Sequence, residues 1–443
     1  MKNLRKLVLL ILGLLVVLVG CSESAKEAQS EGKEKTEKVA STENTTDEPV
    51  EIQFWYGLGS VAGETMEEII GEFNASQDKV KVVGVQQADY GETYQKVQAA
   101  IAAGQPPAVF IGNKIAQMAD AGVLADLTPY IDDRTPVEDY LEVFMSPAQI
   151  DGKIYAFPAY GTTQVMYYRK DLLEQAGIDP KEAYSSWENL YEASKEMQDK
   201  GITAWGHLPM WNHENLMDIA YSNGGQILSD DGKTVMINSP EWVESWDFIR
   251  KQIFENKTCK IESGGQGWEY WYRTIDNVMN GEAMGYTGSS GDKGDLDFEI
   301  IDSIPQPGLN GNPGKPKANG HSLLVPEAAT DEQKAAAYAW IAYFTSPEVS
   351  AKWSMKIGYI PVRKSAMDVE EYKKFIEANP YAAVPYNQAL TATPEFIDPT
   401  EGQIIDALSI AADKVELENI PAQEALDEAQ ETAQKALDEV INK

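Results

Sequence analysis

The sequence predicts an α/β fold made of two lobes, and three features of the chain lead to this prediction. About 390 residues follow Pro49 with ordinary apolar and aromatic content, which is more than one hydrophobic core usually organises. Residues 51–112 alternate strand-like and helix-like patterns, and helical patterns recur from there to the C-terminus. Alternating strands and helices are typical of a mostly parallel sheet covered by helices.

The first part of this body is predicted to follow the order β-α-β-α-β. Strand patterns cover residues 51–56, 80–86 and 108–112, and the last of them is continuously apolar. Helix patterns cover residues 64–76 and 92–103, the first with apolar residues at i, i+3, i+4 and i+7. This order is the start of a mostly parallel sheet.

Later helices carry explicit start signals. Ser185 with Glu188 and Thr330 with Gln333 have capping-box spacing, and the Ser-Pro pairs 239–240 and 346–347 place proline at the first helical position. From residue 400 onward, two amphipathic helices broken at Pro421 are expected. Core packing is expected for their apolar stripe, which consists of Ala425, Leu426, Ala429, Ala433, Leu437 and Val440.

Residues 285–320 are rich in Gly, Pro, Asp and Asn, so they predict a loop region that carries one strand at 298–304. Binding groups tend to lie on such loops.

The N-terminal sequence indicates an export signal. Lys2, Arg5 and Lys6 precede the apolar residues 7–19, a run too short to span a bilayer, which needs roughly 20 residues. The ending Leu18-Val19-Gly20-Cys21 resembles the lipobox of bacterial lipoproteins. That resemblance implies a signal peptide at 1–20, a lipid on Cys21 and a tether to the outer face of the cytoplasmic membrane. The alternative is an ordinary secretory signal followed by a coincidental cysteine.

Residues 22–49 contain almost no large apolar side chain, so 21–49 is expected to be a flexible, lipid-anchored linker.

Charge and cysteine content exclude some kinds of partner. Seventy acidic and thirty-seven basic residues give a net charge of −33, which repels phosphate backbones, so no nucleic acid partner is expected. If Cys21 carries a lipid, Cys259 has no partner for a disulfide. A shielded structural thiol is expected at Cys259, with a reactive thiol near Lys257 and Lys260 as the alternative.

No arrangement of catalytic or metal-binding residues stands out. The nucleophile elbow, the dinucleotide fingerprint and the P-loop are absent. His207 and His213 are not at the i, i+4 spacing of a helical zinc pair. The acidic loop with Asp292, Asp295 and Asp297 could bind calcium, but it lacks the EF-hand pattern. We therefore expect no metal and no cofactor, while paired carboxylates for glycoside hydrolysis stay open.

Aromatic residues suggest recognition of a sugar. Ten tryptophans and twenty-one tyrosines are present, and flat rings with a polar group suit a pyranose, whose C–H faces stack while its hydroxyls form hydrogen bonds. Trp242, Trp246 and Ile249 have helical spacing and are expected in the core. Aromatic residues in loop-like contexts are the better candidates for binding, among them Trp55, Trp268 and Tyr286.

Short motifs over residues 50–443 resemble extracellular solute-binding proteins of the sugar-binding type, which feed ABC importers. Their order and spacing carry the resemblance; they are Phe54-Trp55, Phe73-Asn74-Ala75-Ser76, 99–104 with 106–108, 124–129, 152–158, 167–172 before Ala176-Gly177, and 358–363.

The resemblance implies a periplasmic-binding-protein-like type II fold, with two lobes joined by crossing hinge strands near 157–162, 299–307 and 358–363. Lobe 1 would comprise residues 50–158 and 305–358, and lobe 2 residues 159–304 and 359–443. Ligand would bind in the cleft between them.

Within that family the chain is most similar to the subgroup of the sn-glycerol-3-phosphate-binding protein, partly through its ending at 404–419 and 422–427. Two departures matter. An acidic contact of the subgroup falls near Asn113 and Lys114, and its phosphate-binding arginine falls at Asn387. Losing a guanidinium removes the natural partner of a phosphate, so we expect a neutral sugar. The ligand-binding positions implied or expected are Tyr90, Asn113, Thr162, Trp211, Ser289, Gly320, Tyr359 and Asn387, followed by Trp55, Trp268 and Tyr286.

The expected function is that of a monomeric substrate-binding lipoprotein, not an enzyme. It would capture an extracellular mono- or oligosaccharide by hinge closure and deliver it to a permease. The alternatives are a binder of glycerol 3-phosphate or a glycerophosphodiester, a secreted glycosidase, and a structural or adhesive surface lipoprotein.

Overall fold

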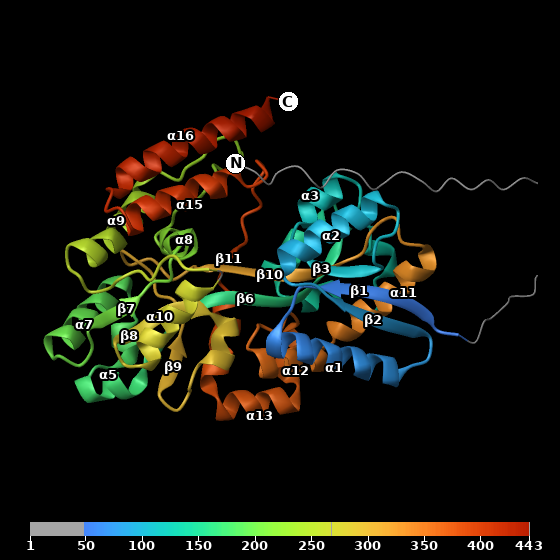
Figure 1. Cartoon of the computed structure of the whole chain (residues 1–443), viewed down its shortest axis with the longest axis horizontal. Helices are drawn as coiled ribbons and strands as arrows, with labels where there is room; N and C mark the ends of the chain where they lie inside the picture. Colours follow the sequence, from blue (N-terminus) through green and yellow to red (C-terminus); the bar gives the residue numbers. More distant parts are fainter. Residues whose placement is uncertain (1–47, 267, 443) are drawn as a thin grey trace, which may run out of the picture. The chain divides into compact units, whose positions relative to one another are not determined.

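One nine-stranded sheet runs through the part of the chain that the computed structural model describes, residues 48–266 and 268–442 (Figure 1). The strand order is β2-β1-β3-β10-β6-β8-β7, with β11 paired to β10 and β9 paired to β6. The strands are β1 Val50–Tyr56, β2 Val80–Gln86, β3 Val109–Gly112, β6 Ala156–Arg169, β7 Trp205–Leu208, β8 Ala283–Ser289, β9 Ile301–Ile304, β10 Lys317–Leu324 and β11 Thr393–Pro394. A separate pair joins β4 Gln149–Ile150 to β5 Lys153–Ile154.

Sixteen α-helices accompany the strands within the described ranges. They are α1 Ser60–Ser76, α2 Tyr90–Ala102, α3 Ile115–Asp120, α4 Glu142–Met145, α5 Lys170–Ala176, α6 Pro180–Ala183, α7 Trp187–Asp199, α8 His213–Tyr221, α9 Pro240–Phe254, α10 Glu269–Met279, α11 Asp331–Phe344, α12 Pro347–Ile357, α13 Glu370–Ala378, α14 Val384–Ala389, α15 Gln403–Glu416 and α16 Ala422–Ile441. Between residues 48 and 442, Gly267 aside, no helix has the length and apolar content that a membrane span requires.

Two apolar cores divide the sheet. The first contains buried side chains from residues 52–160 and 318–389, and the second from residues 165–309 and 404–437. Strand β6 belongs to both, because Phe157 is buried in the first core and Val165 in the second. The predicted two-lobed α/β fold is therefore confirmed.

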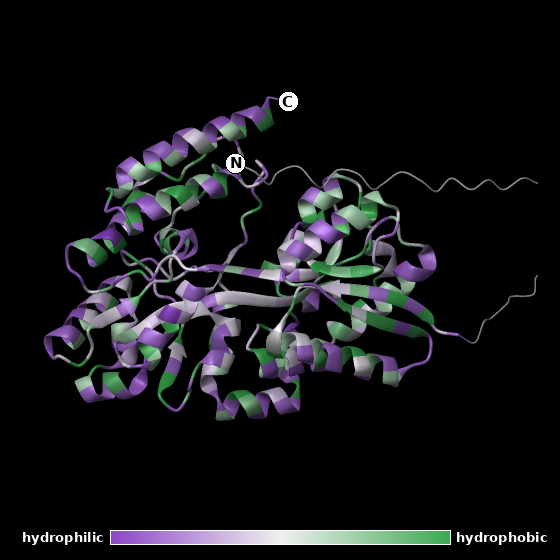
Figure 2. Ribbon diagram, viewed as in Figure 1, coloured by the Kyte–Doolittle hydropathy of each residue, from purple (hydrophilic) through white to green (hydrophobic). Residues whose placement is uncertain are grey.

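The exact lobe boundaries stay predictions, although the cores give some detail. Ile360, Val362 and Tyr386 pack in the first core, although the predicted boundary places residues 359–443 in lobe 2. The C-terminal helices α15 and α16 do pack in the second core. Figure 2 shows hydrophilic and hydrophobic residues alternating along α15 and α16, as on amphipathic helices.

The predicted order β-α-β-α-β is confirmed by β1, α1, β2, α2 and β3, which lie within four residues of the predicted bounds. Strands β2 and β3 both pair with β1 in the parallel sense. The predicted core residues Trp242, Trp246 and Ile249 are fully buried.

The helix start signals were correct with one exception. Thr330 and Gln333 form a reciprocal capping box, and proline occupies the first turn of α9 and α12. The capping box predicted for Ser185 and Glu188 is wrong, because Ser186 is the N-cap of α7 and accepts a hydrogen bond from the Asn189 backbone at 3.1 Å. This register makes Trp187, which is fully buried, the first residue of the helix.

Two further expectations need correction. The strand predicted from residue 298 begins only at Ile301. Val440 is 38% exposed, so the apolar stripe of α16 ends at Leu437. Cys259 is buried beside the Tyr191 hydroxyl, and burial raises the pKa of its thiol to about 12, as expected of a shielded structural cysteine.

Arg363 ties two distant segments of the first lobe together. Its Nε donates to Asp139 Oδ2 at 2.5 Å, and one terminal nitrogen donates to the carbonyl of Arg134 at 3.1 Å. The guanidinium carbon lies 4.8 Å from the centre of the Tyr140 ring. Only 5% of the Arg363 side chain is exposed, so solvent does not screen this pair strongly.

We predict that Arg363→Ala lowers the free energy of unfolding by about 3 kcal/mol, because it leaves the Asp139 carboxylate without its cation. Urea denaturation measures the change. The matched control is Lys81→Ala, which breaks the exposed Lys81–Glu51 pair and should cost at most about 1 kcal/mol. Equal losses in the two variants would contradict the prediction.

Candidate functional site

A cavity of about 960 Å³ lies between the two cores, within the range of about 300–1,000 Å³ that small-molecule sites occupy. Its walls come from both lobes. The side chains relevant to binding are Leu58, Val61, Tyr90, Ile357 and Tyr359 on the first lobe, and Thr162, Gln164, Glu214, Trp268, Tyr270, Trp271, Tyr272, Ser289 and Asp292 on the second.

Aromatic rings at the start of α10 form one wall. Trp268 and Tyr272 are 64% and 52% exposed, which is unusual for such large apolar groups. Trp271 is fixed because its indole Nε1 donates to Asp292 Oδ1 at 3.1 Å. The Trp268 and Trp271 rings meet edge to face at 5.9 Å. The wall therefore presents ring faces in set orientations to the cavity.

Tyrosines of the first lobe form the opposite wall. The Tyr90 hydroxyl lies 2.8 Å from that of Tyr160, and the Tyr90 ring stacks on His321 at 3.7 Å. Tyr359 stacks on Tyr160 with ring centres 5.0 Å apart. These contacts hold Tyr90 and Tyr359 in place on the cavity wall.

Strand β6 supplies the floor at the point where it passes from one core to the other. Thr162 pairs in register with Asn319 of β10, and Gln164 pairs with Ser289 of β8. The Thr162 Oγ1 lies 3.1 Å from Ser289 Oγ. The floor is therefore polar, and its side chains are positioned by backbone pairing.

Most of the charged groups that line this cavity form ion pairs or hydrogen bonds within the protein. Lys317 Nζ donates to Glu214 Oε1 at 2.9 Å, and the charge of Lys317 lowers the pKa of Glu214. Lys356 is paired with Glu68. Asp218 accepts from the Lys317 backbone at 2.8 Å and from Gln306 at 2.7 Å.

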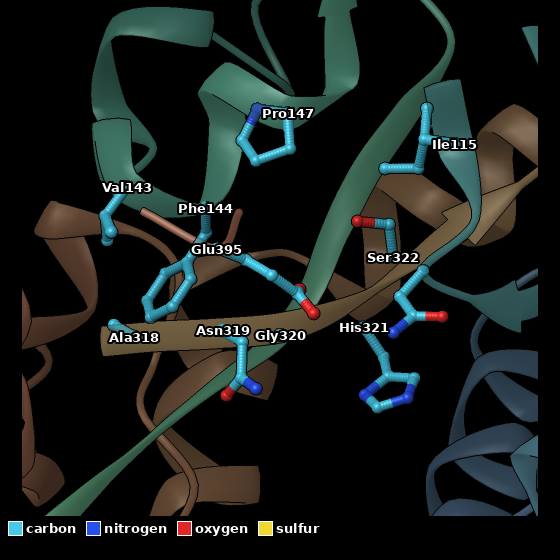
Figure 3. A pocket seen from close by; sticks show the side chains of 11 residues that line it. Ile115, Val143, Phe144, Pro147, Ala318, Asn319, Gly320, His321, Ser322 and Glu395 are labelled. Carbon is cyan, nitrogen blue, oxygen red and sulfur yellow. The ribbon is translucent and has the colours of Figure 1, made fainter. Parts of the chain in front are cut away.

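A second cavity of about 690 Å³ adjoins the first, and the two share His213, Glu214 and Lys317. It continues into a small pocket that is shown in Figure 3. The second cavity and the small pocket share Asn113, Ile115, Pro147 and Glu395.

The structure places seven of the eleven predicted site residues on these cavities. Tyr90, Thr162, Ser289, Tyr359 and Trp268 line the larger one. Asn113 and Gly320 line the small pocket. Contact with a ligand stays a prediction for each of them. A Cβ on Gly320 would come within 2.6 Å of the Tyr160 carbonyl oxygen, so the packing of β10 on β6 already explains this glycine.

The other four predicted residues do not line these cavities. Trp211 donates to Asp413 at 2.8 Å, although its ring meets the edge of Tyr270. The Tyr286 side chain is fully buried, and its hydroxyl donates to Asp292 at 3.0 Å. Trp55 donates to Gln53 on β1, and Asn387 is exposed on α14. We therefore carry none of these four into the proposals below.

Some residues of the cavity walls were not among the predicted site residues. Tyr270, Trp271 and Tyr272 could have been found, because four aromatic residues crowd positions 268–272. Gln164, Asn319 and Glu395 carry no local signal. Asp292, considered above for calcium, accepts hydrogen bonds from Trp271 and Tyr286, so donors rather than a cation surround its carboxylate.

Two α/β lobes around a cavity of ligand size define the class of two-lobed solute-binding proteins. The chain matches the bacterial extracellular solute-binding protein family over residues 68–380 and belongs to it. It is a solute-binding protein, not an enzyme.

Among curated relatives, the chain is 26% identical to the sn-glycerol-3-phosphate-binding periplasmic protein UgpB of Brucella abortus (strain 2308) over 361 residues, which are 78% of this chain and 82% of the relative. The protein of the same name from Escherichia coli O1:K1 / APEC is 23% identical, covering 77% of this chain and 81% of the relative.

Solved structures share the fold at lower sequence identity. The cyclic alpha-maltosyl-1,6-maltose binding protein from Arthrobacter globiformis has a TM-score of 0.75 and 21% identity, covering 88% of this chain and all of the other. UgpB from Mycobacterium tuberculosis, in complex with glycerophosphocholine, has a TM-score of 0.74 and 22% identity. The match covers 88% of this chain and 99% of the other.

Buried carboxyl groups at the site predict a pH-dependent stability. Burial raises the pKa of Asp292 and of Asp218 to about 7. A carboxyl group whose pKa rises on folding holds more protons in the folded chain than in the unfolded chain between pH values of about 4 and 7. The free energy of unfolding should therefore fall as the pH rises through this range.

We predict that Asp292→Asn removes part of this fall, as measured by urea denaturation at several pH values across the range. Asparagine keeps an acceptor for Trp271 but does not titrate. Asp230→Asn, at an exposed position away from the site, serves as the control. A pH dependence in Asp292→Asn equal to that of the natural chain would contradict the prediction.

Proposed function

We propose that the chain captures a neutral carbohydrate in the cavity between its lobes and delivers it to the permease of an ABC importer. The observation that carries this proposal is the combination of exposed aromatic faces and hydroxyl or amide groups on one cavity. Trp268 and Tyr272 stand exposed there beside Thr162, Gln164 and Ser289. A pyranose offers apolar faces for such rings and hydroxyls for such polar groups.

The charges of the cavity support a neutral ligand over a phosphate. Both lysines that line it, Lys317 and Lys356, are paired with glutamates, and none of the described residues that line it is an arginine. Carboxylates line it as well, among them Asp292 and Asp295. A phosphate would need a cation free to bind it, preferably a guanidinium.

The relatives point to two ligand classes. Those named for sn-glycerol 3-phosphate, and the structure with glycerophosphocholine, favour a phosphorylated polyol. Structural neighbours bind cyclic alpha-maltosyl-1,6-maltose or acarbose, which favours a sugar. We favour the sugar because of the paired lysines, and glycerol phosphates or glycerophosphodiesters remain the second candidate.

Binding would favour closure of the two lobes. Tyr90 and Tyr359 belong to the first lobe and Trp268 and Trp271 to the second, so a ligand that contacts both sets stabilises the state in which they approach. A micromolar complex needs about −8 kcal/mol, which several stacked rings and hydrogen bonds can supply after ordering costs.

We also propose that the protein acts as a monomer, anchored by a lipid on Cys21 after removal of residues 1–20. These residues and the linker up to residue 47 lie outside the described part of the chain. The support for this proposal is the lipobox-like sequence together with membership of an extracellular family.

Thermal unfolding in the presence of neutral mono- and oligosaccharides, glycerol 3-phosphate and glycerophosphodiesters tests the ligand class. We predict stabilisation by a neutral saccharide. Trp268→Ala should weaken its binding about tenfold or more, a loss of about 1.4 kcal/mol, because the sugar loses a ring face on which to stack. Calorimetric titration measures the affinity.

The control for Trp268→Ala is Ile410→Ala, which removes a similarly exposed apolar side chain that does not line the cavities. It should leave the affinity unchanged. Stabilisation by a glycerol phosphate alone would replace the carbohydrate proposal with the second candidate. Turnover of a bound saccharide would contradict a purely binding role.

For the anchor, we predict that cells expressing the full chain incorporate a fatty-acid probe into the protein and that Cys21→Ala abolishes the label. The substitution removes the only thiol that a lipobox would modify. Cys259→Ala, which changes the other cysteine, should retain the label. An unlabelled natural chain would contradict lipidation.

A further inference from the structure

Polar side chains without partners gather around the small pocket at strand β10. Glu395 reaches with its carboxylate across β10 toward the middle of this pocket (Figure 3). Within residues 48–266 and 268–442, the Glu395 carboxylate forms no hydrogen bond or ion pair. The side chains of Asn113, Asn319 and Ser322 line the same pocket and likewise form no hydrogen bond with the described residues.

Other carboxylates on these cavities either have partners or, like Asp295 and Asp120, are exposed to solvent, whereas Glu395 is half-buried. Glu214 is paired with Lys317, and Asp218 and Asp292 each accept two hydrogen bonds. Because Glu395 is half-buried, water can reach its carboxylate, and a ligand that displaces this water must replace its hydrogen bonds. Burial raises the pKa of Glu395, although the charge of Lys317 opposes the shift.

The pocket has the size and position to receive part of a ligand from the second cavity. Its volume of about 30 Å³ suits a single hydroxyl or water. It opens into the cavity of about 690 Å³, whose lining includes Glu395 and Asn113 as well. The Phe144 ring and Pro147 give the pocket an apolar side, which suits the C–H groups of a sugar ring.

We infer that Glu395 is a specificity-determining residue that accepts hydrogen bonds from neighbouring hydroxyls of a sugar ring lying in the second cavity. The ligand is then an oligosaccharide that passes the Glu214–Lys317 pair, with other rings against Trp268 and Trp271 in the first cavity. This inference rests on the proposed function, since it needs a neutral saccharide.

A carboxylate in this pocket would discriminate between ligands by their charge and hydrogen-bond donors as well as by their size. It is an acceptor only, so it pairs with hydroxyl donors and repels a phosphate. The amides of Asn113 and Asn319 add donors and acceptors around the same ring. Two lysines lie near Glu395: Lys317 is already paired with Glu214, and Lys114 lines the same cavity without an ion pair to Glu395.

Calorimetric titration of the full chain with a series of neutral saccharides, from monosaccharides to heptasaccharides, tests the inference. The natural chain should bind oligosaccharides more tightly than the corresponding monosaccharide. Glu395→Gln should weaken oligosaccharide binding about tenfold or more, because it replaces charge-assisted hydrogen bonds with neutral ones. Glu395→Asp, which keeps the charge on a shorter side chain, gives a second variant if the first does not fold.

The matched control is Glu192→Gln, which makes the same change at an exposed position outside these cavities and should change affinity by less than about twofold. Unchanged oligosaccharide binding in both Glu395 variants would overturn the inference and leave the proposed function intact. Equal affinity for mono- and oligosaccharides would also overturn it. Failure of the natural chain to bind any neutral saccharide would overturn both.

Discussion

The continuous strand β6 is the constraint on which the rest of the structure depends. Its fourteen residues pair first with β10 and then with β8 and β9. Buried residues near its ends lie in different cores, whereas Thr162 and Gln164 between them face the larger cavity. Because one hydrogen-bonded strand belongs to both lobes, the space between the lobes has a fixed polar floor.

The ligand preference of this site depends on which polar and charged groups already have an ion-pair or hydrogen-bond partner within the protein. The lysines that line the larger cavity are bound to glutamates, and its buried aspartates accept hydrogen bonds from indole, phenol, amide or backbone groups. The cavities also present the exposed face of Trp268, hydroxyl groups of Thr162 and Ser289 that can form further hydrogen bonds, and the Glu395 carboxylate. These groups match an uncharged, hydroxyl-rich ligand better than an anion.

Local sequence patterns predicted most of the secondary structure, because apolar spacing and helix-start residues act over a few neighbouring positions. Apolar spacing located β1, α1, β2, α2 and β3, and proline located the starts of α9 and α12. The predicted capping box at Ser185 failed because burial of Trp187 set the helix register. The site was harder to predict, because it joins residues far apart in the sequence. Glu395 meets Asn113 and Asn319 only through the fold, and resemblance alone favoured Asn387, which lies on an exposed helix surface.

Calorimetric titration at low and high salt, with neutral oligosaccharides and with glycerol 3-phosphate, tests the central claim most directly. Charged ligands bind less tightly as salt screens them, whereas neutral ligands are insensitive to salt. Our account predicts saturable binding of a neutral oligosaccharide with an affinity that salt leaves unchanged, and no heat with glycerol 3-phosphate. Saturable binding of the anion, weakened by salt, with no response to any neutral saccharide would contradict it.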